Sequence, residues 1–188
     1  NHKNAIIRNA SEPNGTNPGY SGDRYCPDCD TVFEKGYTYW NEGNLTWKLD
    51  ADGTLTISGT GAMKDYDYYN NPSPASQKKD SVKKVVIEDG VTSIGYGAFS
   101  DCSSLKTISL SCKSSLKKSD FGEQANLVSY TNQHLLTKTA AKAATCSESG
   151  NKEYWTCEHC GKYFLSDDTN PATATAVELS ETVIPALN

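Results

Sequence analysis

Four residues near the C-terminal end of the chain have the types and spacing of a metal site. They are His134, Cys146, Cys157 and Cys160, and the last two form a Cys-x-x-Cys pair inside the stretch YWTCEHCGKYF. Thiolate sulfur and imidazole nitrogen are donors that tetrahedral zinc prefers, and a Cys-x-x-Cys pair supplies half of such a site. The spacing therefore predicts a structural zinc ion held by these four side chains.

Two other chemistries use the same cysteines. A disulfide is the usual covalent cross-link outside the cell, and three cysteines allow one pair and one remaining thiol. A thiol oxidoreductase would place Cys157 at a helix N-terminus, but the residues after Cys160 have no helical apolar period. Zinc and disulfide or free thiols therefore stay open as alternatives. We expect no redox catalysis, and no cofactor other than zinc.

A second Cys-x-x-Cys pair, Cys26 and Cys29, lies 131 residues before the first, in the stretch RYCPDCDTVF. The two copies align without a gap from Gly19 and Gly150 onwards. A shared spacing over this length is typical of a duplicated structural unit. The second copy therefore predicts the fold of the first.

The first copy does not carry the complete set of candidate ligands. Gly15 stands where the second copy has Cys146, and His2 is one residue out of step with His134. This copy therefore does not supply the complete set of four protein ligands that a structural zinc site needs. We expect Cys26 and Cys29 to form a disulfide or a free pair. We also expect one of the aromatic residues that follow them, Phe33, Tyr37, Tyr39 or Trp40, to pack against the central hairpin.

The middle of the chain repeats at a shorter period. SVKKVVI (81–87) matches SLKTISL (104–110) at a spacing of 23, and a fainter copy follows at 22, where Phe121 corresponds to Phe99. In each copy the L-x-x-I-x-L spacing turns apolar side chains inward from a short strand, and the alternate side chains turn outward. The outward residues form a candidate interaction face: Lys84, Val86, Thr107, Ser109, Ser129 and Thr131.

The stretch VTSIGYGAFSDCSSLKTISL (91–110) resembles the BspA-like leucine-rich repeat known from bacterial surface proteins. Residues 45–63 look like the β-hairpin that often precedes such repeats, and the flanking Cys-x-x-Cys units resemble zinc-ribbon-like modules beside them. The resemblance implies a surface or secreted protein of a Gram-positive gut bacterium. It also implies that Cys102 points into the core of its repeat, whereas Cys112 has no such explanation.

Together these patterns predict a mainly β, loop-rich fold: a short leucine-rich-repeat solenoid capped by a β-hairpin and flanked by two small Cys-x-x-Cys units. Abundant Ser, Thr, Gly and Tyr, with a mean hydropathy of -0.61, are typical of such a chain. The expected segments are 1–38 for the N-terminal unit, 39–132 for the hairpin and repeats, and 133–188 for the C-terminal unit.

Several classes of function are disfavoured by composition. The net charge of -5 and the dispersed lysines leave no basic face for a nucleic acid. No apolar run approaches the ~20 residues that cross a bilayer, so we expect no membrane insertion. No G-x-S-x-G, H-E-x-x-H or phosphate-binding glycine loop is present. We expect that the protein is not an enzyme.

The expected function is a non-catalytic, cell-surface or secreted module for adhesion or protein interaction, with an extracellular protein or glycan as partner. One alternative is an accessory module of a larger surface enzyme that binds glycans. Tyr66, Tyr68 and Tyr69 would then stack on sugar rings. The other alternative is the thiol oxidoreductase considered above.

Overall fold

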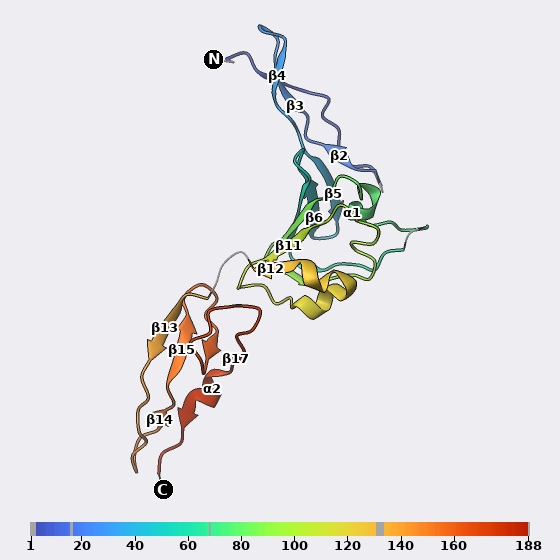
Figure 1. The fold of residues 1–188 in the computed structure, drawn as a ribbon. Helices are drawn as coiled ribbons and strands as arrows, with labels where there is room; N and C mark the ends of the chain where they lie inside the picture. The colour runs from blue at the N-terminus through green and yellow to red at the C-terminus, as the bar shows by residue number, and fades with distance from the viewer. Residues whose placement is uncertain (1–2, 16, 68, 131–133, 188) are drawn as a thin grey trace. The chain divides into compact units, whose positions relative to one another are not determined.

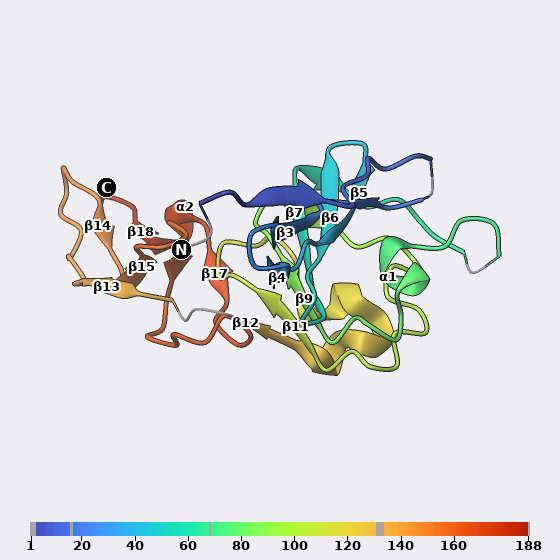
Figure 2. The same ribbon diagram turned by 90° about the horizontal axis from the view of Figure 1, so that it is seen from above.

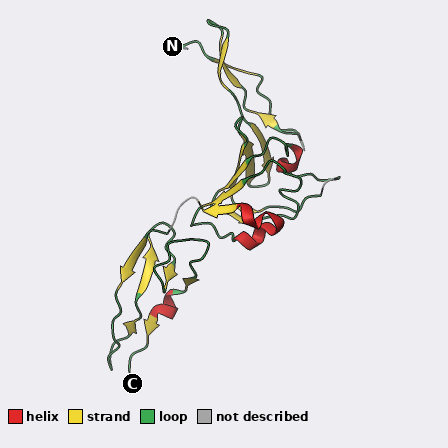
Figure 3. Ribbon diagram, in the orientation of Figure 1, coloured by secondary structure: helices red, strands yellow, loops and turns green. Residues whose placement is uncertain are grey.

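The computed structural model describes residues 3–15, 17–67, 69–130 and 134–187. Strands dominate, and the helical segments are short (Figures 1 and 3). They are α1 (Pro74–Gln77), the 3-10 helix η1 (Lys118–Leu127) and α2 (Leu179–Thr182). None of the described helices has the length and apolar character needed to span a bilayer. The predicted mainly β, loop-rich fold is confirmed.

The chain divides into two compact units. Unit 1 comprises Asn1–Leu110 and Ser114–Ser129, and unit 2 comprises Ser111–Lys113 and Tyr130–Asn188. The sequence predicted three segments instead. The first two share a unit because β2 (Gly19–Tyr20) pairs with β5 (Thr38–Glu42) and so joins the N-terminal segment to the central sheet.

Unit 1 is built on a seven-stranded sheet in the order β12-β11-β9-β7-β6-β5-β2. Its remaining strands are β6 (Leu45–Leu49), β7 (Thr54–Gly59), β9 (Lys84–Ile87), β11 (Thr107–Leu110) and β12 (Val128–Tyr130). Strands β6 and β7 form the predicted hairpin, whose turn contains Gly53 at a φ of 91°. Glycine suits this position because a side chain there would be strained. Figure 2 shows β6, β9 and β11 within the same sheet.

The predicted repeat spacing of 23 is confirmed by strand register. Val85 of β9 pairs with Ile108 of β11 on one side and with Leu55 of β7 on the other, and both pairings are parallel. The second strand of the hairpin therefore extends the parallel strands of the repeats. All three side chains are buried on the same face of the sheet.

The core of unit 1 lies against this buried face. Trp47 of β6 makes ring contacts with Tyr66 and Phe99, and Phe99 stacks on Phe121 at a centroid distance of 6.4 Å. Trp40 of β5 pairs with Trp47 and is 4% exposed, as expected for an aromatic residue packing on the hairpin. Phe99 and Phe121, which occupy equivalent positions in successive repeats, thus pack directly against each other.

The N-terminal segment is a three-stranded antiparallel ribbon of β1 (Ile6–Arg8), β3 (Asp23–Cys26) and β4 (Thr31–Glu34). A buried carboxylate joins it to its neighbours. Asp23 accepts hydrogen bonds from the Tyr20 hydroxyl, the Gly36 amide and the Lys35 ammonium group. These bonds connect the ribbon to β2 and to the segment that leads into β5. A separate parallel pair is formed by β8 (Gly61–Ala62) and β10 (Val91–Ser93).

Unit 2 repeats the architecture of that ribbon. Its larger sheet contains β13 (Leu136–Thr139), β15 (Tyr154–Cys157), β16 (Tyr163–Phe164) and β17 (Ala176–Val177), and β14 (Gly150–Asn151) pairs with β18 (Val183–Ile184). Ile7 faces Arg24 in the first copy, and Lys138 faces Trp155 in the second. Both pairs differ by the predicted offset of 131, so the duplication extends to backbone pairing.

Candidate metal centre

One group of side chains in unit 2 has the composition of a metal site. The ligand atoms of Cys112, His134, Cys157 and Cys160 all lie within 4.8 Å of one another. Cys112, His134 and Cys157 are buried, and Cys160 is half-buried. Three sulfurs and one imidazole nitrogen form one of the ligand sets used by structural zinc.

The spacing within the group fits a tetrahedral ion. The Sγ atom of Cys160 lies 3.6 Å from Nδ1 of His134. Sulfur and nitrogen ligands at the usual zinc distances of about 2.3 and 2.05 Å, separated by the tetrahedral angle, lie roughly 3.6 Å apart. These two atoms are therefore already at the separation that shared coordination requires.

Backbone hydrogen bonds position the Cys-x-x-Cys turn. Cys157 ends β15, and its carbonyl accepts a hydrogen bond from the Gly161 amide at 2.7 Å. Gly161 has a φ of 70°, a left-handed conformation that glycine adopts without strain. The turn therefore returns the chain to β16 and brings Cys160 back toward Cys157.

His134 is fixed from two sides. Its amide donates to the carbonyl of Thr169 at 2.7 Å, and its ring lies 4.6 Å from the ring of Phe164. Burial lowers the pKa of His134, and the nearby Lys162 lowers it further. A neutral imidazole is the form that binds a metal ion, so both effects favour ligation.

The three thiols respond differently to the same enclosure. Burial raises the pKa of Cys112 to about 11, and the neighbouring Cys157 and Cys160 add to the rise. At Cys157 burial also opposes ionisation, but backbone amides, first that of Cys160, hold its pKa below the usual value. Burial raises the pKa of Cys160 as well. Of the three thiols, Cys157 is therefore the one whose ionisation its surroundings favour.

The structure brings together three of the four predicted ligands. Cys146 is exposed and is not part of the group, and Cys112 occupies the fourth place. Cys146 lies in a turn that is closed by a hydrogen bond from the Thr145 amide to the Glu148 carbonyl, and this turn holds Cys146 away from the ligand group. The available signals for Cys112 were the odd cysteine count and the lack of a role for it in the repeats.

The first Cys-x-x-Cys copy is placed differently. Cys26 is buried and Cys29 is exposed, and both lie at the turn between β3 and β4. Neither belongs to the metal-ligating group found among the described residues. His2 lies outside the described residues.

The candidate interaction face is only partly as expected. Lys84 and Ser129 are exposed, and Val86 and Thr107 are half-buried. Ser109 is 4% exposed, so it offers little surface. Its short side chain belongs to a strand with neighbours on both edges, where it rises little above the backbone. Thr131 lies outside the described residues.

Two of the tyrosines predicted to stack on sugar rings differ in their exposure to solvent. Tyr66 is buried, and its hydroxyl donates to Glu42, whereas Tyr69 is exposed. Tyr68 lies outside the described residues. Tyr66 therefore serves the core of unit 1 and is not available for stacking on a sugar.

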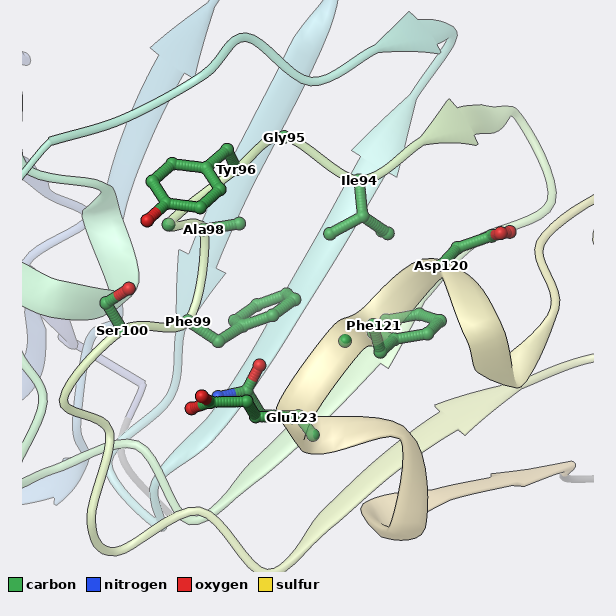
Figure 4. A pocket seen from close by; sticks show the side chains of 12 residues that line it. Ile94, Gly95, Tyr96, Ala98, Phe99, Ser100, Asp120, Phe121 and Glu123 are labelled. Carbon is green, nitrogen blue, oxygen red and sulfur yellow. The ribbon is translucent and has the colours of Figure 1, made fainter.

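A cavity of about 320 Å³ lies between the loops of successive repeats. Phe99 and Phe121 lie beside each other along it, and Tyr96 also lines it (Figure 4). Asp120 points away from its centre, and its carboxylate accepts a hydrogen bond from the Lys117 amide at 2.8 Å. Sequence patterns had not indicated this cavity.

No protein-family model matches the chain, and no curated protein matches it either. Two solved structures match in part. One is a leucine-rich repeat protein from Eubacterium ventriosum, with 34% identity over 40% of this chain and 20% of that chain, and a TM-score of 0.37. The other is a leucine rich cell surface protein from Faecalibacterium prausnitzii, with 22% identity over 49% of this chain and 29% of that chain, and a TM-score of 0.25. This chain thus spans less than a third of either protein.

Proposed function

We propose that this chain is a non-catalytic interaction or adhesion module of a cell-surface or secreted protein. In this proposal the parallel strands of unit 1 are rungs of a short BspA-like leucine-rich-repeat solenoid, and the partner binds the outward face of the sheet. Unit 2 is a zinc-ribbon-like module that the metal holds together. The partner is an extracellular protein.

The observation that carries the proposal is a continuous outward row across four strands. Strand register aligns Tyr39, Lys48, Thr56 and Val86 side by side. All four are half-buried, as expected for side chains that stand next to one another on an open sheet face. An aromatic, a cationic, a hydroxyl and an apolar side chain thus follow one another along this row.

The hairpin widens this face beyond the repeats. Three rungs alone would span about 10 Å, whereas seven strands at the usual ~4.8 Å spacing span about 29 Å. A standard interface of ~800 Å² per partner is roughly 30 Å across. The whole sheet therefore has the width that a specific protein partner needs.

The aromatic end of the row is held in place by its neighbours. Tyr37 and Tyr39 meet edge to face at 5.9 Å, and the Lys48 ammonium group lies 4.5 Å from the Tyr37 ring centroid. Tyr39 also donates a hydrogen bond to Glu12 at 2.7 Å. Pre-ordered aromatic side chains lose little entropy on binding, which favours them as contact points.

The role proposed for zinc is structural. The small sheets of unit 2 bury little apolar surface, and the described apolar cluster there centres on Cys112, Cys157 and Phe164. A zinc ion is a Lewis acid, and it binds thiolates and imidazole strongly enough to drive the folding of such small modules. The four side chains hold and orient the ion, and Phe164 covers His134.

A photo-crosslinking amino acid at position 56 tests the proposal. We expect it to form specific adducts with members of a panel of extracellular proteins, and we expect competition by the unmodified chain to prevent them. The matched control carries the same group at exposed Glu123, on another element of unit 1. Equal labelling from both positions, or hits only on a glycan array run in parallel, would contradict a protein-binding sheet face.

A further inference from the structure

The cavity between the repeat loops has the volume of a site for a small ligand. Small-molecule pockets range from roughly 300 to 1,000 Å³, and this cavity of about 320 Å³ stands at the lower end of that range. Its walls come from residues 94–100 and from residues 120–124 of η1 (Figure 4). The volume therefore suits a ligand of the size of a single sugar ring.

The loop that carries Tyr96 is fixed to the rest of unit 1. The Tyr96 amide donates to the Asp65 carboxylate at 2.8 Å, and the Tyr96 carbonyl accepts a hydrogen bond from the Tyr66 amide at 2.8 Å. Gly95 lies so close to the Lys64 carbonyl that a Cβ there would overlap the oxygen. The Tyr96 backbone is thus held on both sides, while its side chain is 83% exposed. An exposed ring on a fixed backbone is a platform on which an apolar face of a ligand can stack.

Other lining residues provide hydrogen-bonding groups. Ser100, Glu123 and Gln124 contribute a hydroxyl, a carboxylate and an amide. Ser100 and Glu123 are exposed and Gln124 is half-buried, so a ligand can reach them. A sugar ring has hydroxyl groups around its edge and apolar C–H groups on its faces, which this combination of polar groups and an aromatic ring matches.

The charges of the lining residues disfavour an anionic ligand. Among the described residues that line the cavity, none carries a positive charge, whereas Asp120 and Glu123 are acidic. Asp120 points away from the centre of the cavity and accepts the hydrogen bond from the Lys117 amide. Glu123 is therefore the lining carboxylate that can accept hydrogen bonds from a ligand.

The aromatic residues do not form the cage that an organic cation needs. Cations bind over the faces of aromatic rings. Phe99 and Phe121 stack on each other at an interplanar angle of 17°, and each is only 3% exposed. Their ring faces are thus largely used within the core, which leaves a neutral ligand as the better match.

We propose that this cavity binds a sugar ring of a neutral glycan. The ring of Tyr96 stacks on the apolar face of the sugar, and Glu123 and Gln124 hydrogen-bond its hydroxyl groups. This activity goes beyond the protein-binding role proposed above and does not depend on it. The cavity lies on the side of the sheet that carries Trp47, which contacts Phe99, whereas strand alternation turns Thr56 to the opposite side.

An NMR titration of the isotopically labelled full chain with a panel of neutral methyl glycosides tests this proposal. We expect at least one glycoside to shift the amide signals of Gly95 and Gly97, with a dissociation constant in roughly the millimolar range for so small a ligand. Amide signals of β13 and β15 should not move. Glucuronate and choline serve as anionic and cationic probes, and we expect neither to shift these signals.

Two tyrosine variants give a matched comparison. Tyr96→Ala removes the stacking ring, so we expect the affinity for the glycoside to fall by at least about 5-fold. Tyr69→Ala is the control, because Tyr69 is 88% exposed and is not among the residues that line the cavity. It should bind the glycoside like the unmodified chain.

Two variants at Glu123 separate hydrogen bonding from charge. Glu123→Gln keeps an acceptor oxygen, so the affinity for a neutral sugar should change by less than about 3-fold, whereas Glu123→Ala should weaken it by about 10-fold. Equal losses in these two variants would show that the negative charge binds the ligand and would contradict a neutral sugar.

Three further outcomes would each overturn the proposal: no shift of the Gly95 and Gly97 signals with any glycoside, a shift with choline alone, or equal losses in Tyr96→Ala and Tyr69→Ala. Free glycoside should leave crosslinking from position 56 unchanged. Failure of the sugar site can therefore be distinguished from failure of the protein-binding sheet face.

Discussion

Cys112 and Cys157 contribute to one cluster of ligand atoms, all within 4.8 Å of one another, although η1, β12, β13 and β14 lie between them in the chain. Cys112 belongs to the three-residue segment Ser111–Lys113, which is part of unit 2 while the residues on both sides belong to unit 1. The chain therefore contributes to the metal centre from two separate stretches of sequence.

Replacing Cys112 tests which cysteine is the fourth ligand. Cys112→Ser removes a buried thiol from the group, so we expect zinc affinity to fall by at least about 100-fold. Competition with a chromophoric chelator measures the change. Cys146→Ser should bind zinc like the unmodified chain, and the opposite ranking would restore Cys146 as the ligand.

Removing zinc should destabilise unit 2 selectively. Its strands bury few apolar side chains, and structural zinc supplies on the order of 10 kcal/mol in small modules. We expect chelation to speed hydrogen exchange in β13, β15 and β16 while β6 and β7 stay protected. Uniform exchange before and after chelation would contradict a structural metal.

Asp23 should make the N-terminal ribbon sensitive to acid. The hydrogen bond from Tyr20, followed by that from the Gly36 amide, lowers the pKa of Asp23. A carboxyl group with a lowered folded-state pKa stabilises the fold above its unfolded pKa of about 3.9, and this stability is lost as pH falls through the folded value. We expect hydrogen exchange in β3 to rise below about pH 4.

The variant Asp23→Asn should exchange faster than the unmodified chain at pH 7 and lose most of that pH dependence. Asp28→Asn is the matched control, because Asp28 is exposed and accepts a hydrogen bond from the Asn4 side-chain amide at 2.8 Å. Identical pH profiles for the unmodified chain and Asp23→Asn would show that this carboxylate does not hold the ribbon.

Phe121 should carry much of the packing of the last repeat. It is buried and stacks on Phe99, so Phe121→Ala removes a large core side chain and should cost about 3–5 kcal/mol of unfolding free energy. Tyr96 lines the same cavity but is 83% exposed. We therefore expect Tyr96→Ala to change the unfolding free energy by no more than about 0.5 kcal/mol. Chemical denaturation followed by tryptophan fluorescence compares them. Similar losses for both variants would contradict the stacked core.

Local patterns were enough to predict the hairpin and the repeat strands of unit 1. Alternation around Asp50–Gly53 predicted the hairpin, and the spacing of 23 predicted that Val85 and Ile108 would occupy equivalent positions. The offset of 131 likewise predicted that the two Cys-x-x-Cys turns would share a fold. Such patterns are readable because the side-chain period of a strand and the length of a repeat are properties of the chain itself.

The tertiary structure decided which distant segments meet. The sequence favoured Cys146 as a ligand because it lies near the Cys-x-x-Cys pair, but a metal group is defined by distances in space, and the path after β11 brings Cys112 there instead. The same holds for Ser109, whose outward register was predicted but whose burial depends on neighbouring strands. By itself the sequence determined periodicity and duplication. Contacts between segments far apart in the chain depend on how loops fold back, and no local pattern records that path.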